Sequence, residues 1–194
     1  MLLRVLLLGT LSASAVANPG PADAVREFYT WRMASATAGA PDRDDLARMQ
    51  PMLTPELACV LDAARRYRDG LIAQMTPENQ FKPPFAEGDF YSGLFMTPRR
   101  FAVGESKIEG SRARVEIRFL ANEMSGDMWT DARVKLRRTA DRWRIDDVDF
   151  REIFTWEGFD FATAGTLMKN LYLILEHDAA AKKASDVAQC HRLG

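Results

Sequence analysis

The chain has 194 residues, of which 47% are hydrophobic, 27% charged and 10% aromatic. A chain of this size buries one sizeable core but is too short for two ordinary domains, so a single domain is predicted. The composition excludes collagen, a coiled coil and a wholly disordered chain, because each needs a stronger bias. Lysine and arginine number 26 against 27 aspartate and glutamate residues. The global charge therefore gives no indication of a nucleic-acid partner.

The first residues have the pattern of a secretion signal. Arg4 supplies a short positive region, an apolar run follows from Val5, and Ala15-Val16-Ala17 matches the small-x-small pattern of a signal peptidase site. The run is shorter than the roughly 20 apolar residues that span a bilayer. No cysteine stands at the cleavage point to carry a lipid anchor. We expect a signal peptide at 1–17, cleavage near Ala17, and a periplasmic or secreted mature chain, 18–194, that does not span the membrane.

Cys59 and Cys190 are the only cysteines of the chain. An oxidising compartment makes an even pair a candidate disulfide. Cys59 points away from the apolar stripe of the helix predicted around it, so it is not expected to fill the core. We predict a structural bridge that straps the tail, 181–194, over the outside of that helix. The loop that it closes is worth about 4 to 5 kcal/mol in the chain-entropy model.

Helical spacing of apolar residues predicts the first elements of the mature chain. A stripe from Val25 to Ala36 indicates one helix, which 37–41 ends, and a short helical segment is expected over 42–49. A clear helix then runs from an N-cap at Thr54, with proline at its first position, to about Ile72. The next segment, 76–98, holds four prolines and scattered aromatic residues. It is predicted to be an ordered loop, because disordered linkers rarely carry so many rings.

From residue 99 the pattern changes to the period of two that is typical of strands. We predict strands at 99–108, 111–120, 128–138 and 142–150, with a β-bulge in the last one at Asp146-Asp147, where the phase slips. An amphipathic helix over 164–177 and a tail from about residue 179 complete the chain. This order predicts an α+β fold: a curved antiparallel sheet of about four strands covered by N-terminal helices and a C-terminal helix.

Three short motifs carry a family resemblance. They are Ala24-Val25-Arg26-Glu27-Phe28-Tyr29, Leu53-Thr54-Pro55-Glu56-Leu57 and Trp143-Arg144-Ile145-Asp146-Asp147-Val148. With them the chain resembles, over most of 21–175, a bacterial domain-of-unknown-function family of small envelope proteins in the nuclear-transport-factor-2-like superfamily. The resemblance implies a cystatin-like cone of curved sheet and helices around a pocket. It implies no particular activity, since that superfamily holds enzymes and non-enzymes alike.

The residues offer little for metal or cofactor chemistry. The mature chain has two histidines, and no pair of histidines or cysteines stands at ligand spacing. Glycine-rich phosphate loops and a Gly-x-Ser-x-Gly elbow are absent from the sequence. We therefore expect no metal site, no cofactor and no serine hydrolase chemistry.

Arg32 lies within the apolar stripe of the first helix, where an uncompensated charge costs several kcal/mol. One interpretation is that its stem packs while its guanidinium reaches water. The other is that Arg32 pairs with Asp146 or Asp147 and, with Tyr29, forms a polar anchor for a ligand's carboxylate or carbonyl. The superfamily resemblance also implies that an enzyme of this fold would use an acidic residue with a tyrosine or a histidine inside the cone, and here Asp146, Asp147, Asp149 and Tyr29 could form such a set. Acidic residues at a bulge more commonly bind nearby backbone or face water.

A second candidate surface is electrostatic. Long charged side chains on an open sheet face are usually solvated, but arginine and tryptophan are also favoured interface residues. The face suits an acidic protein partner or a second copy of the chain, and nucleic acid is not expected for an exported protein. On the side opposite their apolar residues, the two strongest strands carry Trp129 and six basic residues against two acidic ones, Glu116 and Asp131. The basic residues are Arg112, Arg114, Arg118, Arg133, Lys135 and Arg137.

The sequence therefore favours a non-enzymatic periplasmic binding or interaction protein. It would bind a small ligand in the cone pocket or an acidic partner on the basic sheet face. The alternative is a small pocket enzyme of the isomerase or dehydratase type that uses aspartate and tyrosine. Both interpretations require the strands to form one layer, with apolar residues toward the helices and arginines toward the outside.

Overall fold

A computed structural model describes residues 18–35, 37–94, 96–123, 126–151, 155–156, 159–160, 165–179, 181–182 and 186–194. The predicted signal peptide, 1–17, lies outside the described residues. The helices are α1 (Pro21–Ser35), α2 (Arg43–Met49), α3 (Pro55–Ile72) and α4 (Leu167–His177), with short 3-10 helices η1 (Gln50–Met52) and η2 (Val187–Leu193). Within these ranges no helix is long and apolar enough to cross a bilayer.

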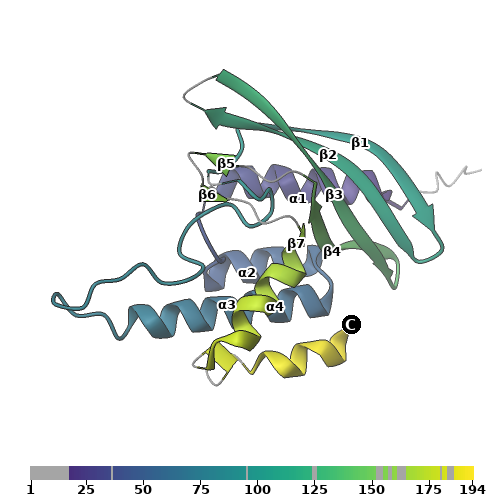
Figure 1. Cartoon of the computed structure of the whole chain (residues 1–194). Helices are drawn as coiled ribbons and strands as arrows, with labels where there is room; N and C mark the ends of the chain where they lie inside the picture. The colour runs from purple at the N-terminus through teal and green to yellow at the C-terminus, as the bar shows by residue number, and fades with distance from the viewer. Residues whose placement is uncertain are drawn as a thin grey trace, which may run out of the picture.

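The sheet is antiparallel and has five strands in the order β1-β2-β3-β4-β7. Figure 1 shows it as a curved layer over α1, with α3, α4 and the C-terminal segment on the β4 side. The predicted α+β fold is confirmed at this level, with one strand more than expected. Its strands are β1 (Arg100–Glu109), β2 (Arg112–Glu123), β3 (Gly126–Thr139), β4 (Arg142–Phe150) and β7 (Gly165–Thr166). A separate pair is formed by β5 (Thr155–Trp156) and β6 (Phe159–Asp160).

Side-chain alternation divides the sheet into two faces. In β2, Val115 and Ile117 are buried whereas Arg114 and Arg118 are exposed. The bulge in β4 is also confirmed. Lys135 pairs with Asp147 and the next residue of β3, Leu136, pairs with Ile145, which leaves Asp146 as the extra residue. We call the side toward α1 the inner face and the opposite side the polar face. The arginines therefore face outward, as predicted.

Caps and prolines explain where the helices begin. Thr54 caps α3 by accepting a hydrogen bond from the N–H of Leu57, and Pro55 takes the first helical position, where a missing N–H costs nothing. Thr166 caps α4 in the same way. The predicted start of that helix at residue 164 falls outside the described residues. The fifth strand, β7, was not predicted because two residues carry no periodicity.

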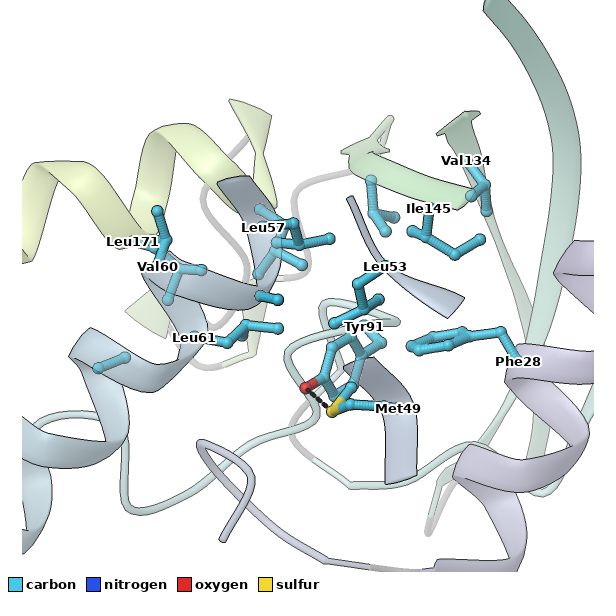
Figure 2. Packing of buried hydrophobic residues seen from close by; sticks show 14 of the residues in the cluster. Phe28, Met49, Leu53, Leu57, Val60, Leu61, Tyr91, Val134, Ile145 and Leu171 are labelled. Atoms are coloured by element: carbon cyan, nitrogen blue, oxygen red, sulfur yellow. Dashed lines mark hydrogen bonds between the residues drawn. The ribbon is translucent and has the colours of Figure 1, made fainter. Parts of the chain in front are cut away.

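The core joins α1, α3, β4 and the loop at 76–98 (Figure 2). Leu53 and Ile145 form an isolated parallel bridge, and the N–H of Thr54 donates to the carbonyl of Ile145 at 2.8 Å. The loop contributes Tyr91, which is 2% exposed and whose hydroxyl donates to the sulfur of Met49. The prediction of an ordered loop is therefore confirmed for its described part.

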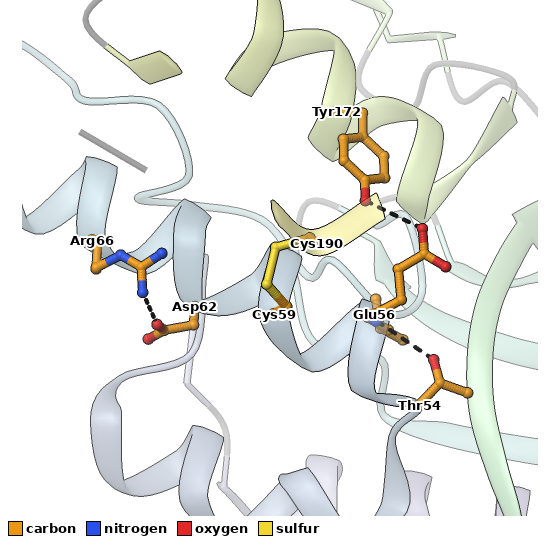
Figure 3. The surroundings of a disulfide bond; sticks show 8 residues. Thr54, Glu56, Cys59, Asp62, Arg66, Tyr172 and Cys190 are labelled. Carbon is orange, nitrogen blue, oxygen red and sulfur yellow. Dashed lines mark hydrogen bonds and ion pairs between the residues drawn. A yellow bond between two sulfur atoms is a disulfide. The ribbon is translucent and has the colours of Figure 1, made fainter. Parts of the chain in front are cut away.

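The predicted disulfide between Cys59 and Cys190 is present, with the two Cα atoms 5.6 Å apart. It fastens η2 to α3, as Figure 3 shows. The tail therefore lies over the outside of α3, and the structural role assigned to the cysteines from the sequence agrees with this geometry.

Replacing both cysteines by serine removes this constraint on the unfolded chain. We expect the free energy of unfolding, measured by urea denaturation, to fall by about 4 to 5 kcal/mol. Limited proteolysis of the double variant should cut within the tail before the sheet is affected. An unchanged denaturation midpoint, with the tail as resistant as in the unchanged protein, would contradict this account.

Candidate functional site

A groove of about 760 Å³ lies along the polar face of the sheet and is closed on one side by α4 and the tail. Five basic and five acidic side chains line it, so its chemistry is that of charged groups. Met168, Tyr172 and His191 form the wall on the helix side. The charged lining residues are Lys107, Arg112, Arg114, Arg133 and Lys135 with Glu56, Glu109, Asp146, Asp147 and Asp149.

On the β4 side the acids of the bulge are already occupied. Asp147 accepts from the Nζ of Lys135 at 3.1 Å and from the N–H groups of Val148 and Met168 at 2.9 and 3.0 Å. Asp146 pairs with the guanidinium of Arg137 at 2.7 Å. A carboxylate at the first turn of α4 also suits the helix dipole. These contacts give both aspartates structural roles.

Ion pairs also neutralise the middle of the predicted basic face. Arg133 pairs with Glu116 at 2.8 Å, and Arg118 pairs with Asp131 at 3.1 Å while its guanidinium lies over the ring of Trp129. The strand register explains why the polar face has less net positive charge than the sequence predicts. It brings the aspartates of β4 beside the basic residues of β3, and a count over β2 and β3 alone does not include them.

Positive charge remains at the β1–β2 end of the groove. Lys107 and Arg114 both approach Glu109, at 3.0 and 3.9 Å, and the described part of the chain gives Arg112 no ion pair. The hydrogen bond and charge of Lys107 hold the pKa of Glu109 below its usual range, so this carboxylate is ionised at neutral pH. Three cations against one anion leave two positive charges in excess. We call Lys107, Arg112 and Arg114 the basic end of the groove.

The tail supplies a residue that the sequence did not indicate. The ring of His191 stacks on Tyr172, with centroids 4.2 Å apart and planes 7° from parallel, and its Nε2 lies 2.8 Å from Glu176. The Tyr172 hydroxyl donates to Glu56 at 3.2 Å (Figure 3). Burial and the charge of Glu56 raise the pKa of Tyr172, so it stays a neutral donor. The sequence offered one signal for this position of His191: it follows Cys190, and the predicted disulfide holds that part of the tail near the helix of Cys59.

Tyr29 lies on the inner face and not in the groove. Its ring centroid is 5.0 Å from that of Phe119 and 5.8 Å from that of Phe101, and its hydroxyl donates to the carbonyl of Tyr91 at 2.6 Å. Burial raises the pKa of Tyr29 well above its usual value. Aromatic rings therefore fill the space where the predicted anchor would need room for a ligand.

The predicted pairing of Arg32 with Asp146 or Asp147 is wrong. Arg32 pairs with Asp89 at 2.9 Å, and the two side chains are only 3% and 1% exposed. The bulge turns both predicted partners to the polar face, whereas the loop at 76–98 places Asp89 inside, where the guanidinium of Arg32 also lies over the ring of Tyr91. Since the guanidinium is buried, it does not reach water either. Of the predicted ligand pocket, the groove therefore holds Asp146 and Asp147, while Tyr29 and Arg32 lie on the other side of the sheet.

The carboxylate of Asp89 organises its own loop. It accepts hydrogen bonds from the N–H groups of Tyr91 and Ser92, each at 3.0 Å. Burial raises the pKa of Asp89, while the charge of Arg32 and these two N–H groups act in the opposite direction. Arg32 also donates to the carbonyl of Thr37. The pair thus ties the end of α1 to the loop.

Comparisons with protein-family models, with curated proteins and with solved structures gave no significant match. In the part of the chain that the structure describes, no group of three His, Cys, Asp or Glu residues is arranged to hold a metal ion.

Replacing Arg32 by methionine keeps the packed stem but leaves Asp89 buried without its cation. We expect a loss of about 3 to 5 kcal/mol in the free energy of unfolding. We also expect a further rise in the pKa of Asp89, measured by NMR titration, because the lowering influence of Arg32 is gone. The double variant Arg32→Met/Asp89→Asn should be more stable than the single one, since no charge stays unpaired. A loss no larger than that of Arg142→Met, an exposed control, would contradict the pairing.

Proposed function

We propose that the protein is a non-enzymatic periplasmic binding protein that holds an acidic segment of a protein partner in the groove on its polar face. The observation that carries the proposal is the excess of positive charge at the basic end. An excess of exposed cations over anions attracts and orients an anionic partner. Elsewhere in the groove, Arg133, Lys135, Asp146 and Asp147 are paired within the protein, so the excess of positive charge lies at the basic end.

The groove also has the form of a binding surface. Its helix side presents Met168, Tyr172 and the ring of His191 a short way from charged side chains. Methionine, tyrosine and arginine are enriched where proteins meet, and aromatic groups anchor a partner beside a polar rim. A partner segment with acidic residues followed by an apolar or aromatic one fits this arrangement best.

A binding role is better supported than the alternative of an enzyme using aspartate and tyrosine. The groups predicted for that chemistry are divided between the two faces of the sheet. Asp147 is saturated by a lysine and two backbone N–H groups. A general acid or base needs a free proton site within reach of a substrate.

The periplasmic location and the superfamily fold are parts of the same proposal. The signal-peptide pattern and a disulfide between the only two cysteines support an oxidising compartment. The curved sheet with α1 on its inner face supports the nuclear-transport-factor-2-like cone. In this protein the working surface is the outside of the cone, because aromatic rings fill the inside around Tyr29.

A fluorescently labelled polyglutamate peptide tests the basic end directly. We expect the mature protein to bind it by fluorescence anisotropy, with an affinity that falls as salt is added, since exposed charges are screened. The variant Arg112→Glu/Arg114→Glu should bind at least about tenfold more weakly, with the same denaturation midpoint.

The matched control is Arg43→Glu/Arg142→Glu, which changes the net charge equally at two exposed positions outside the groove lining. It should retain most of the binding. Failure of the unchanged protein to bind the peptide, or equal losses in the two double variants, would count against the groove as the binding surface.

A further inference from the structure

Among the described residues, no strand pairs with the outer edge of β1. The strand order places β1 at one end of the sheet, and across the described residues it pairs with β2 alone (Figure 1). An edge strand of ten residues offers backbone N–H and C=O groups to any strand that matches it. Ile108 on this strand is 56% exposed. The edge therefore has both unpaired backbone and an uncovered apolar side chain.

A bulge makes this edge self-complementary. The register with β2 shifts between Val103 and Ser106. In an unbroken strand, two residues separated by an odd number of positions face opposite sides of the sheet. Because of the bulge, Phe101 and Ile108 both pair with residues of β2 that point inward, while Arg100 and Glu109 both lie on the polar side. When two β1 strands are aligned antiparallel, the residues that lie opposite each other are therefore on the same face of the sheet.

We propose that two copies of this chain join through their β1 edges as an antiparallel pair, with a two-fold axis between Gly104 and Glu105. Each Arg100 then lies opposite Glu109 of the second copy, and each Phe101 lies opposite Ile108 of the second copy. The two five-stranded sheets become one continuous sheet of ten strands. The interface is isologous, so every cross-strand contact occurs twice.

Charge favours this register of the two β1 strands over registers shifted along the strand. Arg100 is exposed and has no ion pair among the described residues, whereas Glu109 already contacts Lys107 and Arg114 of its own chain and would share its carboxylate with Arg100 of the second copy. Opposite charges on directly facing residues stabilise a strand pair. A shift by two residues would instead place Arg100 opposite Lys107, and like charges at facing positions are destabilising. The same pairing covers the apolar surface of Ile108. The bulge also disfavours pairing with unrelated strands, because a regular strand cannot keep its register on both sides of the bulge.

Sedimentation equilibrium of the mature, disulfide-bonded protein tests the dimer. We expect a dimer that dissociates on dilution. Arg100→Glu alone and Glu109→Arg alone should each weaken self-association by about tenfold or more, since each substitution puts two like-charged pairs in the interface. Combining Arg100→Glu with Glu109→Arg exchanges the charges and should restore the dimer. Arg142→Glu, an exposed change away from this edge, should leave the dimer unaltered.

A monomer at every concentration of the unchanged protein would overturn the proposal. So would a dimer that Arg100→Glu leaves intact, or a charge-exchanged variant that stays monomeric. Arg100 does not line the groove, so its effect on self-association is independent of polyglutamate binding. Failure of one proposal can therefore be distinguished from failure of the other.

Discussion

The β-bulge at Asp146 is the local feature on which the polar side of the molecule depends. It turns two consecutive aspartates to the same face of β4, where they meet Lys135 and Arg137 of β3. Asp147 also holds the N–H of Met168 in the first turn of α4. The start of that helix is therefore fixed to the sheet, and the helix then forms the wall of the groove. Without the extra residue one of the two carboxylates would point toward the core.

The two faces of the sheet follow from this division. On the inner face, aromatic rings and the buried pair of Arg32 and Asp89 join α1 to the loop at 76–98. On the polar face, Glu116, Asp131, Asp146 and Asp147 pair with basic residues across strands, and positive charge is in excess at the basic end. The disulfide adds the last wall by holding the tail against α3, which brings His191 onto Tyr172. Packing thus uses one face of the sheet, and the other face carries the groove where we propose that a partner binds.

Much of this fold is readable in the sequence because its signals are local. The period of two in β2, the cap at Thr54 and the phase slip in β4 depend on neighbours along the chain, and the structure confirms them. The partner of Arg32 was not readable, since Asp89 arrives from a loop without periodicity and 57 positions away in the numbering. The charge balance of the polar face needed the register of β3 with β4, which no single strand reveals. For the groove, sequence reasoning named four of the basic residues and, separately, Asp146 and Asp147, but it did not place the two sets on one surface and it did not name Lys107.

We infer that recognition uses the outside of the sheet, because the inside is packed around Tyr29 and Arg32. Backbone amide shifts in a ¹H–¹⁵N NMR titration with the polyglutamate peptide test it most directly. The account predicts that the largest shift changes fall at Lys107, Arg112 and Arg114. It also predicts that the amides of Tyr29 and Arg32 stay unchanged. Shift changes centred on Tyr29, Arg32 and the loop at 76–98, with β1 and β2 unaffected, would contradict it.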